Sequence, residues 1–209
     1  LYIDQSNGKI VENTFLFSGS EGIPTTFGIA RPDLSTQISL DGDLAFICAN
    51  NGALLCANLT DASISWCRKY QQTPLLTDWN LSKNAAYRKI SKPLVGRKNV
   101  LFSPFDSISV FLVDKNTGEL IKETAFPKWR QFAIAGIDLA VMSNTSGDLS
   151  FLSLENLSVK TSVQGNFVLL DNFEFSDGII AKKKDSFVKI SNSGQILDAI
   201  PIPTNFLPI

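Results

Sequence analysis

The chain has 209 residues, a formal net charge of -1 and 44% hydrophobic residues, so it is long enough to bury a sizeable core in one or two domains. Its near-neutral charge gives no overall attraction to nucleic acid or to anionic membranes. The sequence contains no histidine, which excludes Ser-His-Asp and Cys-His catalysis, imidazole metal ligation and histidine acid–base chemistry. Only carboxylate, Lys, Tyr or Cys chemistry remains.

Short apolar runs typical of β-strands recur along the chain between Gly, Asn, Asp and Ser turns, with no long helical period. One pattern occurs five times: an apolar run enters a short polar turn, and a second strand with an apolar anchor follows. The copies are YIDQSNGKIVEN from residue 2, CANLTDASISW from 56, LVDKNTGELIKE from 112, LSLENLSVKTS from 152 and VKISNSGQILD from 188. Their anchors are Ile10, Ile64, Leu120, Val159 and Ile196.

The turn of each copy requires a residue in the left-handed conformation, which glycine adopts at the least cost because it has no Cβ. Three copies carry glycine there, at Gly8, Gly118 and Gly194. Ala62 and Leu157 replace it in the second and fourth copies, so those two copies are degenerate.

A further strand and turn precede every copy after the first, in residues 43–59, 99–114, 138–154 and 178–191, and a first strand lies upstream, for example at 35–40 and 131–136. The unit is therefore four antiparallel strands, with anchor spacings of 54, 56, 39 and 37 residues. This pattern predicts an all-β fold in one domain over residues 1–209: a β-propeller of four-stranded antiparallel blades, with about four and a half blades in a partial or open ring. The alternative is a β-sandwich with coincidentally similar hairpins.

The order apolar strand, Asp, polar turn, Gly, apolar strand resembles the repeat of the pyrroloquinoline-quinone-like propellers. Asp4 with Gly8, the run Asp114 to Gly118, and Trp66 at the end of SISW carry the likeness. That superfamily includes quinoprotein alcohol dehydrogenases, BamB-like lipoproteins of outer-membrane protein assembly and lumenal domains of some endoplasmic-reticulum proteins. Its members usually have seven or eight blades, so we expect these residues to be part of a longer chain.

Resemblance to the quinone-dependent enzymes implies bound calcium, a carboxylate base, an adjacent cysteine pair and a tryptophan against the quinone. The sequence has no Cys-Cys pair and no convergent carboxylates. We interpret DGD at 41–43 as a β-turn between the first two strands of a blade, and Asp171, Glu174 and Asp177 as a solvated connection. We therefore predict a non-catalytic protein with no cofactor and no metal site.

Residues 68–98 lengthen one repeat and form a basic, aromatic insertion between blades. They hold eight of the nineteen basic residues and one acid, Asp78, which makes the insertion +7 and the rest of the chain -8. Aromatic and basic residues on a long loop fit a partner-binding surface, for which an acidic protein surface, anionic headgroups or single-stranded nucleic acid would suit the charge. They fit a solvated loop that covers a blade edge at least as well. The run 128–130 lies on the next connection between blades and is expected on the same face. The predicted partner-binding residues are Arg68, Lys69, Tyr70, Trp79, Tyr87, Arg88, Lys89, Lys128, Trp129 and Arg130.

Three further features are the cysteines, a short lysine run and the glycosylation sequons. Cys48, Cys56 and Cys67 form either three buried thiols, which we favour, or one disulfide and a free thiol. Lys182 to Lys184 flank a turn and indicate an ordinary charged hairpin. Four Asn-x-Ser/Thr sequons occur, at Asn58, Asn80, Asn144 and Asn156, and they give little preference for a glycosylated lumenal protein. Asn58 falls at a strand end, where it is a poor glycan acceptor.

The sequence thus predicts a propeller scaffold for protein–protein interaction, with protein partners bound through a loop face and no nucleic acid. The resemblance implies a BamB-like role outside the cytoplasm, in the periplasm or at the inner face of the outer membrane, with membrane association through a partner or a lipid anchor. The alternatives are a quinone-dependent dehydrogenase and a eukaryotic stress-sensor-type propeller of the endoplasmic-reticulum lumen.

Overall fold

The computed structural model describes residues 2–3, 10–12, 36–49, 52–73, 89, 91–175 and 178–202. Every helix or strand assigned in this part of the chain is a β-strand. None of these residues forms a helix with the length and hydrophobicity that a membrane crossing requires.

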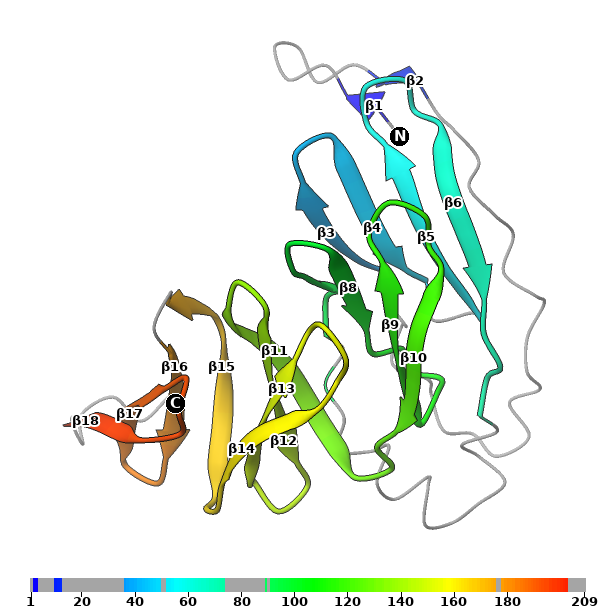
Figure 1. Ribbon diagram of the computed structural model, residues 1–209. Helices are drawn as coiled ribbons and strands as arrows, with labels where there is room; N and C mark the ends of the chain where they lie inside the picture. Colours follow the sequence, from blue (N-terminus) through cyan, green and yellow to red (C-terminus); the bar gives the residue numbers. More distant parts are fainter. Residues whose placement is uncertain are drawn as a thin grey trace, which may run out of the picture.

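The strands form four antiparallel sheets of four strands and one two-stranded sheet, β1 (Tyr2–Ile3) with β2 (Ile10–Glu12). In each larger sheet the strands pair in chain order, and the sheets follow one another along an arc (Figure 1). We number these sheets as blades. Blade 1 holds β3 (Gln37–Asp41), β4 (Leu44–Cys48), β5 (Ala53–Asn58) and β6 (Ile64–Lys69). Blade 2 holds β7 (Leu94–Val95), β8 (Asn99–Phe102), β9 (Ser109–Asp114) and β10 (Leu120–Ala125). Blade 3 holds β11 (Trp129–Gly136), β12 (Leu139–Asn144), β13 (Leu149–Ser153) and β14 (Val159–Val163). Blade 4 holds β15 (Phe167–Phe175), β16 (Gly178–Lys183), β17 (Ser186–Ser191) and β18 (Ile196–Pro201).

The predicted anchors mark the first residue of the last strand in each copy, but only Leu120 packs against a core cluster among those whose burial is described. Ile64, Val159 and Ile196 are 42%, 55% and 49% exposed. The last strand lies at the outer rim of a radial stack, where neighbouring blades diverge and cover less of each other. These three anchors therefore mark strand starts and not buried positions.

Each outer strand also contains a β-bulge at its second residue. In blade 1, Cys56 pairs with Trp66 and Ala57 pairs with Ile64, so Ser65 is left without a partner across the ladder. Equivalent register shifts occur in the other three blades, at Ile121, Lys160 and Leu197. A bulge increases the local twist and makes the free edge of a sheet harder to pair with another chain.

The left-handed turn residues are where the sequence predicts them. Gly118 and Gly194 have φ values of 69° and 82°, and the replacements Ala62 and Leu157 adopt 55° and 57°. Gly8 lies outside the described residues. At the end of each third strand a side-chain oxygen accepts a hydrogen bond from a backbone N–H of the turn. The accepting residues are Asn58, Asp114, Ser153 and Ser191. These hydrogen bonds make the four turns one structural motif despite their different sequences.

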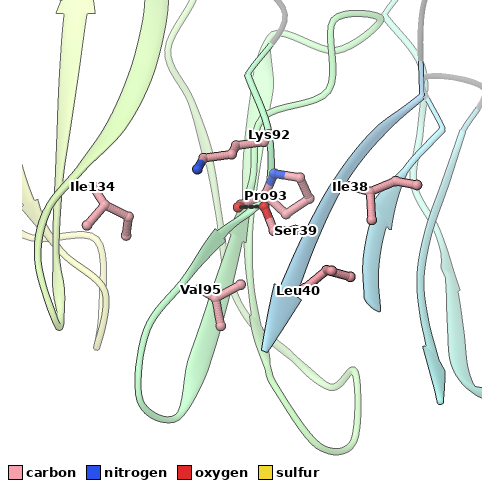
Figure 2. A pocket seen from close by; sticks show the side chains of 7 residues that line it. All are labelled: Ile38, Ser39, Leu40, Lys92, Pro93, Val95 and Ile134. Carbon is pink, nitrogen blue, oxygen red and sulfur yellow. Dashed lines mark hydrogen bonds between the residues drawn. The ribbon is translucent and has the colours of Figure 1, made fainter. Parts of the chain in front are cut away.

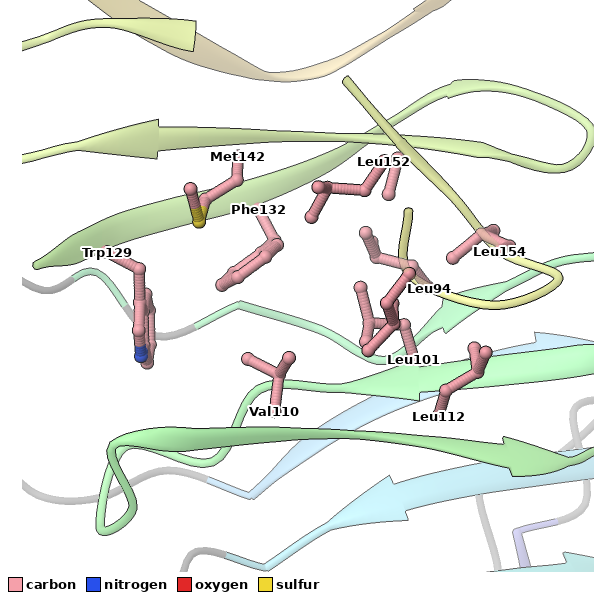
Figure 3. Close-up of a cluster of buried hydrophobic side chains, with 11 residues drawn as sticks. Leu94, Leu101, Val110, Leu112, Trp129, Phe132, Met142, Leu152 and Leu154 are labelled. Atoms are coloured by element: carbon pink, nitrogen blue, oxygen red, sulfur yellow. The ribbon is translucent and has the colours of Figure 1, made fainter. Parts of the chain in front are cut away.

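The hydrophobic core lies between blades. Leu94, Leu101, Val110 and Leu112 of blade 2 face Trp129, Phe132 and other apolar side chains of blade 3 (Figure 3). A second cluster joins blades 1 and 2 through Phe46, Cys56 and Trp66, and a third joins blades 3 and 4 through Phe151, Phe167 and Ile190. Each blade is stable because its neighbours cover the apolar faces that it cannot bury alone.

Three local predictions are settled by the strand boundaries. Gly42, with φ of 57°, lies in the turn between β3 and β4, so DGD is a β-turn as predicted. Asp171 and Glu174 lie within β15 and not in a connection, and Asp177 is outside the described residues. Strand β6 extends through Lys69 and β7 begins at Leu94, so the stretch between these strands is 70–93 and is shorter than 68–98.

Candidate interaction surface

The antiparallel order gives the stack of blades two faces. Links between blades and the turns between second and third strands emerge at one face, which we call the connection face; it lies toward the bottom of Figure 1. The other turns emerge at the opposite face, which we call the hairpin face. The Lys182 to Lys184 run ends at the β16–β17 turn and therefore also lies on the connection face.

The two predicted partner-binding segments meet on the connection face. The backbone N–H of Lys89 donates a hydrogen bond to the carbonyl of Arg130 at 2.7 Å, and Thr145 N–H donates to the carbonyl of Lys128 at 2.9 Å. The end of the insertion is therefore fixed against the start of β11. Trp79, Tyr87 and Arg88 lie outside the described residues.

Trp129 is a core residue. Its side chain is fully buried, with its ring centroid 5.3 Å from that of Phe132. It belongs to the apolar cluster between blades 2 and 3, where it faces away from solvent (Figure 3). The prediction that Trp129 contacts a partner is therefore wrong for its side chain, because the first residue of β11 points into the neighbouring blade.

Tyr70 joins two blades. Its hydroxyl donates to Asp106 Oδ1 at 2.5 Å, and Gln72 Nε2 donates to Asp106 Oδ2 at 2.6 Å. Its ring lies 5.1 Å from that of Phe111. Burial, followed by the negative charge of Asp106, raises the pKa of Tyr70 well above its usual range. The half-buried Tyr70 side chain thus already has a structural role, in contrast to the exposed contact that the sequence predicted.

Arg68 also contacts the next blade. Its Nη1 donates to the carbonyl of Gly118 at 3.4 Å, and its neighbour Trp66 donates from Nε1 to the carbonyl of Lys115 at 3.1 Å. These bonds hold the outer strand of blade 1 on the last turn of blade 2. Arg68 is half-buried, so only part of its side chain faces solvent.

Four of the predicted cations remain at the surface of the connection face: Lys69 and Lys128 are exposed, and Lys89 and Arg130 are half-buried. We call them the connection-face cations. Within the described part of the chain none of them forms an ion pair. Two cations of the hairpin face do: Lys115 with Asp41 at 2.7 Å and Arg97 with Asp138 at 2.6 Å.

Two carboxylates of the connection face, Asp106 and Asp148, are bound by neutral donors. Asp106 accepts hydrogen bonds from Tyr70 and Gln72, and Asp148 accepts them from Asn144 Nδ2 at 3.1 Å and the Gly165 N–H at 3.0 Å. These acids are therefore held inside loops and do not neutralise the connection-face cations.

The structure adds a groove that the sequence did not predict. It has a volume of about 270 Å³ and lies among the first strands of three blades. In Figure 2, Ile38 and Leu40 lie to one side of it and Ile134 to the other, and Ser39 Oγ donates to the carbonyl of Pro93 at 2.6 Å. We call it the inner-strand groove; it is lined by Ile38, Ser39, Leu40, Lys92, Pro93, Val95 and Ile134. The apolar–polar alternation of STQISL was its one local signal.

The described residues contain no group of three or more His, Cys, Asp or Glu side chains placed to hold a metal ion. Cys48 and Cys56 are buried thiols, as favoured from the sequence, whereas Cys67 is an exposed thiol, and none of the three is in a disulfide. Burial raises the pKa of the Cys56 thiol.

No protein-family model matches the chain, and no curated protein matches it. Among solved structures, the chain is similar to BamB from Moraxella catarrhalis, with 12% identity and a TM-score of 0.53 over 78% of this chain and 48% of that chain. It is also similar to the computationally designed Ika8 protein, with 10% identity and a TM-score of 0.53 over 78% of this chain and 47% of that chain. The fold is a β-propeller fold.

At such low identity the likeness concerns the fold alone. The chain spans about half the length of each of the two solved structures that it resembles. The blades described above are therefore the part of the prediction that these comparisons support.

Proposed function

We propose that the chain is a non-catalytic propeller scaffold that binds an acidic protein surface through its connection face. The observation that carries this proposal is the combination of four surface cations without ion pairs in the described residues and nearby carboxylates bound by neutral donors. An acidic partner would supply the missing counter-charges. Complementary charge of this kind steers association and selects among partners.

A rigid frame supports this role. The Tyr70–Asp106 hydrogen bond and the Lys89–Arg130 backbone bond fix the ends of the insertion to blades 2 and 3. Side chains that are already in position lose less entropy on binding than side chains on a free loop.

We further propose that the repeat is of the pyrroloquinoline-quinone-like type and that the protein acts outside the cytoplasm, as a BamB-like scaffold. The fold similarity to BamB supports this proposal, together with Asp114 to Gly118 and Trp66, which match the repeat pattern. Trp66 lies directly against Gly118 of the next blade, which gives the two motif residues a common packing role.

Charge reversal tests the binding surface. The probe is a fluorescent peptide of alternating Glu and Ser, titrated at low and at physiological salt. The triple variant Lys69→Glu, Lys128→Glu and Arg130→Glu should weaken binding by about ten-fold or more, since each surface ion pair contributes up to about 1 kcal/mol. The wild-type affinity should also fall as salt is added.

The matched control reverses three exposed lysines elsewhere, in the variant Lys98→Glu, Lys122→Glu and Lys160→Glu. It changes the net charge by the same amount and should leave at least half of the wild-type affinity. Equal weakening by both triple variants would show that net charge alone attracts the peptide, and it would contradict a specific connection-face surface.

Thiol labelling tests the compartment. Cys67 is the exposed thiol of the described residues, whereas Cys48 and Cys56 are buried. A maleimide that does not cross the cytoplasmic membrane should modify Cys67 in unlysed cells of the native source, and a Cys67→Ser variant should not be modified. Modification only after lysis would place the protein inside the cytoplasm and contradict the proposal.

A further inference from the structure

Cations of the connection face form two groups that lie on either side of one turn, between β12 and β13. We propose that the partner binds both groups with an extended acidic segment, which crosses the junction between blades 3 and 4 and carries carboxylates at each end of a short neutral stretch. This inference rests on the proposed function as a scaffold that binds an acidic protein. It adds the form of the partner and the spacing of its charges.

The first group lies at the start of β11. It consists of three of the connection-face cations, Lys89, Lys128 and Arg130, which we call the link cations. Because the Lys89 N–H donates to the carbonyl of Arg130, the insertion and the link to blade 3 present their charges in one place. All three side chains are exposed or half-buried, and none forms an ion pair within the described residues.

The second group lies at the turn between β16 and β17 and consists of Lys183 and Lys184, which we call the turn lysines. Lys183 shares a face of β16 with Ala181, which packs toward blade 3, and its Nζ lies 4.9 Å from the ring centroid of Phe167. Lys184 is exposed, with φ of 50°. Among the described residues neither lysine forms an ion pair, although Asp185 follows Lys184 directly. Since a cation above an aromatic ring keeps its charge, both lysines can attract a carboxylate.

The β12–β13 turn connects the two groups. Its Thr145 N–H donates to the carbonyl of Lys128, and its Gly147 carbonyl accepts from the Phe167 N–H, both at 2.9 Å. Phe167 in turn pairs with Lys183 across the ladder of blade 4. These contacts form a continuous path from the link cations to the turn lysines, in agreement with the contacts that β11 makes with β15 and β16.

The surface of this turn favours a neutral stretch in the middle of the ligand. Thr145 and Ser146 offer polar groups without charge. Asp148 accepts hydrogen bonds from Asn144 and from the Gly165 N–H, and its negative charge disfavours a further carboxylate above the turn. Residues 144–148 also contain no aromatic ring on which a base could stack, which favours a peptide over single-stranded nucleic acid.

The geometry of adjacent blades sets the spacing of the charges. Facing sheets are about 10 Å apart and neighbouring strands about 4.8 Å, so the two groups lie on the order of 10–20 Å from each other. An extended segment advances about 3.3 Å per residue, so about three to six neutral residues would span the gap. Binding of one end raises the local concentration of the other, which strengthens a ligand whose spacing fits.

The first test compares two labelled peptides of fourteen residues with blocked ends and four Glu among Ser and Gly. In the contiguous peptide the four Glu are consecutive, and in the spaced peptide two Glu pairs are separated by five neutral residues. The wild type should bind the spaced peptide about three-fold or more tightly than the contiguous one, because only the spaced peptide reaches both groups with its middle uncharged. Equal binding, or tighter binding of the contiguous peptide, would overturn the proposal.

The second test removes the turn lysines. The variant Lys183→Gln with Lys184→Gln should lose the preference for the spaced peptide. The matched control Lys122→Gln with Lys160→Gln removes two lysines from outer strands and should keep that preference. Lys183→Arg retains the charge beside Phe167 and should keep it too, which separates lost charge from lost packing. A preference that survives in the first variant, or that disappears in the control, would contradict the proposal.

Competition identifies the class of ligand. Unlabelled spaced peptide should displace the labelled one more effectively than a single-stranded oligothymidylate with the same number of charges. Stronger displacement by the oligonucleotide would mean that the two groups bind nucleic acid, and it would overturn the proposal.

These results are separable from those of the proposed function. The connection-face triple variant keeps both turn lysines, and the turn-lysine variant keeps every connection-face cation. Equal binding of the spaced and contiguous peptides, with Glu-Ser binding still weakened by the triple variant, would reject this inference alone. Equal weakening of Glu-Ser binding by the triple variant and its control would instead reject the acidic-surface proposal.

Discussion

The junction between blades 1 and 2 and the junction between blades 2 and 3 fill the same space with residues of opposite size. In the first, Trp66 follows the bulge of the outer strand and lies on the turn residue Gly118, where a Cβ atom would come within 2.5 Å of the indole Cδ2. In the second, the residue after the bulge is the exposed Lys122, and the turn residue is Leu157, which is only 4% exposed and belongs to the core cluster.

The comparison explains why the repeat is degenerate in sequence but regular in structure. A large ring on the outer strand leaves room only for glycine in the turn of the next blade. A side chain that points into solvent, such as Lys122, leaves room for leucine in that turn. Leu157 adopts a left-handed backbone conformation, which costs on the order of 1–2 kcal/mol for a residue with a Cβ. Burial of its side chain returns about 1.5–3 kcal/mol, so the substitution of the consensus glycine is tolerated.

The largest expected effect is the loss of the ring at the first junction. Trp66→Ala should lower the free energy of unfolding by about 3–5 kcal/mol, because it removes a large buried side chain and leaves a cavity beside Gly118. Urea unfolding followed by far-UV circular dichroism measures this change. A loss below about 1 kcal/mol would mean that the ring does not hold the two blades together.

A smaller loss is expected when the facing glycine gains a side chain. Gly118→Ala should destabilise the fold by about 2–3 kcal/mol, because its φ is positive and the added methyl group meets the indole. Combining it with Trp66→Leu should cost at least about 1 kcal/mol less than the sum of the two single losses, since the smaller side chain makes room for the methyl group. Strict additivity in this double-mutant cycle would contradict the size relationship.

Substitution by glycine at the turn residues of the two degenerate copies should change the free energy of unfolding in opposite directions. Leu157→Gly should destabilise by about 1–2 kcal/mol, because the loss of buried apolar surface exceeds the relief of backbone strain. Ala62→Gly should stabilise by up to about 1 kcal/mol, because Ala62 is half-buried and loses little contact surface. The urea midpoints of the two variants, measured side by side, check the sign of each change; the same sign for both would disprove the comparison.

The smallest effect concerns the ion pair on the hairpin face between blades 2 and 3. The backbone N–H of Arg97 donates to Asp138 and lowers the pKa of that carboxyl group, with its guanidinium adding to the shift. Because the folded pKa lies below the unfolded value of about 3.9, the stabilisation is present above that value and is lost as the pH falls through the folded pKa. Asp138→Asn should therefore be less stable than the wild type at pH 7, and the difference should shrink by pH 3. A difference that is independent of pH between these values would contradict the assignment.

Local sequence signals determined most of the strand pattern. The left-handed turns at Gly118 and Gly194 followed from turn chemistry, and the comparison of the repeat copies placed Ala62 and Leu157 at the same turn position. The four-stranded unit followed from alternating apolar runs and the spacing of hairpins. Strand period and turn conformation depend on residues that are neighbours in the chain, so a single sequence contains the information that they need.

The tertiary structure alone decided which aromatic and basic residues reach the surface. The run KWR at 128–130 has the basic and aromatic residues that are typical of an exposed binding surface. Trp129 is nevertheless buried while Lys128 is exposed, because blade 2 packs against the first residue of β11. Tyr70 binds Asp106, which is 36 residues away, and the inner-strand groove joins residues from Ile38 to Ile134. Burial depends on which distant segment packs against a side chain, and that pairing is set by the stacking of whole blades and is not contained in any local pattern.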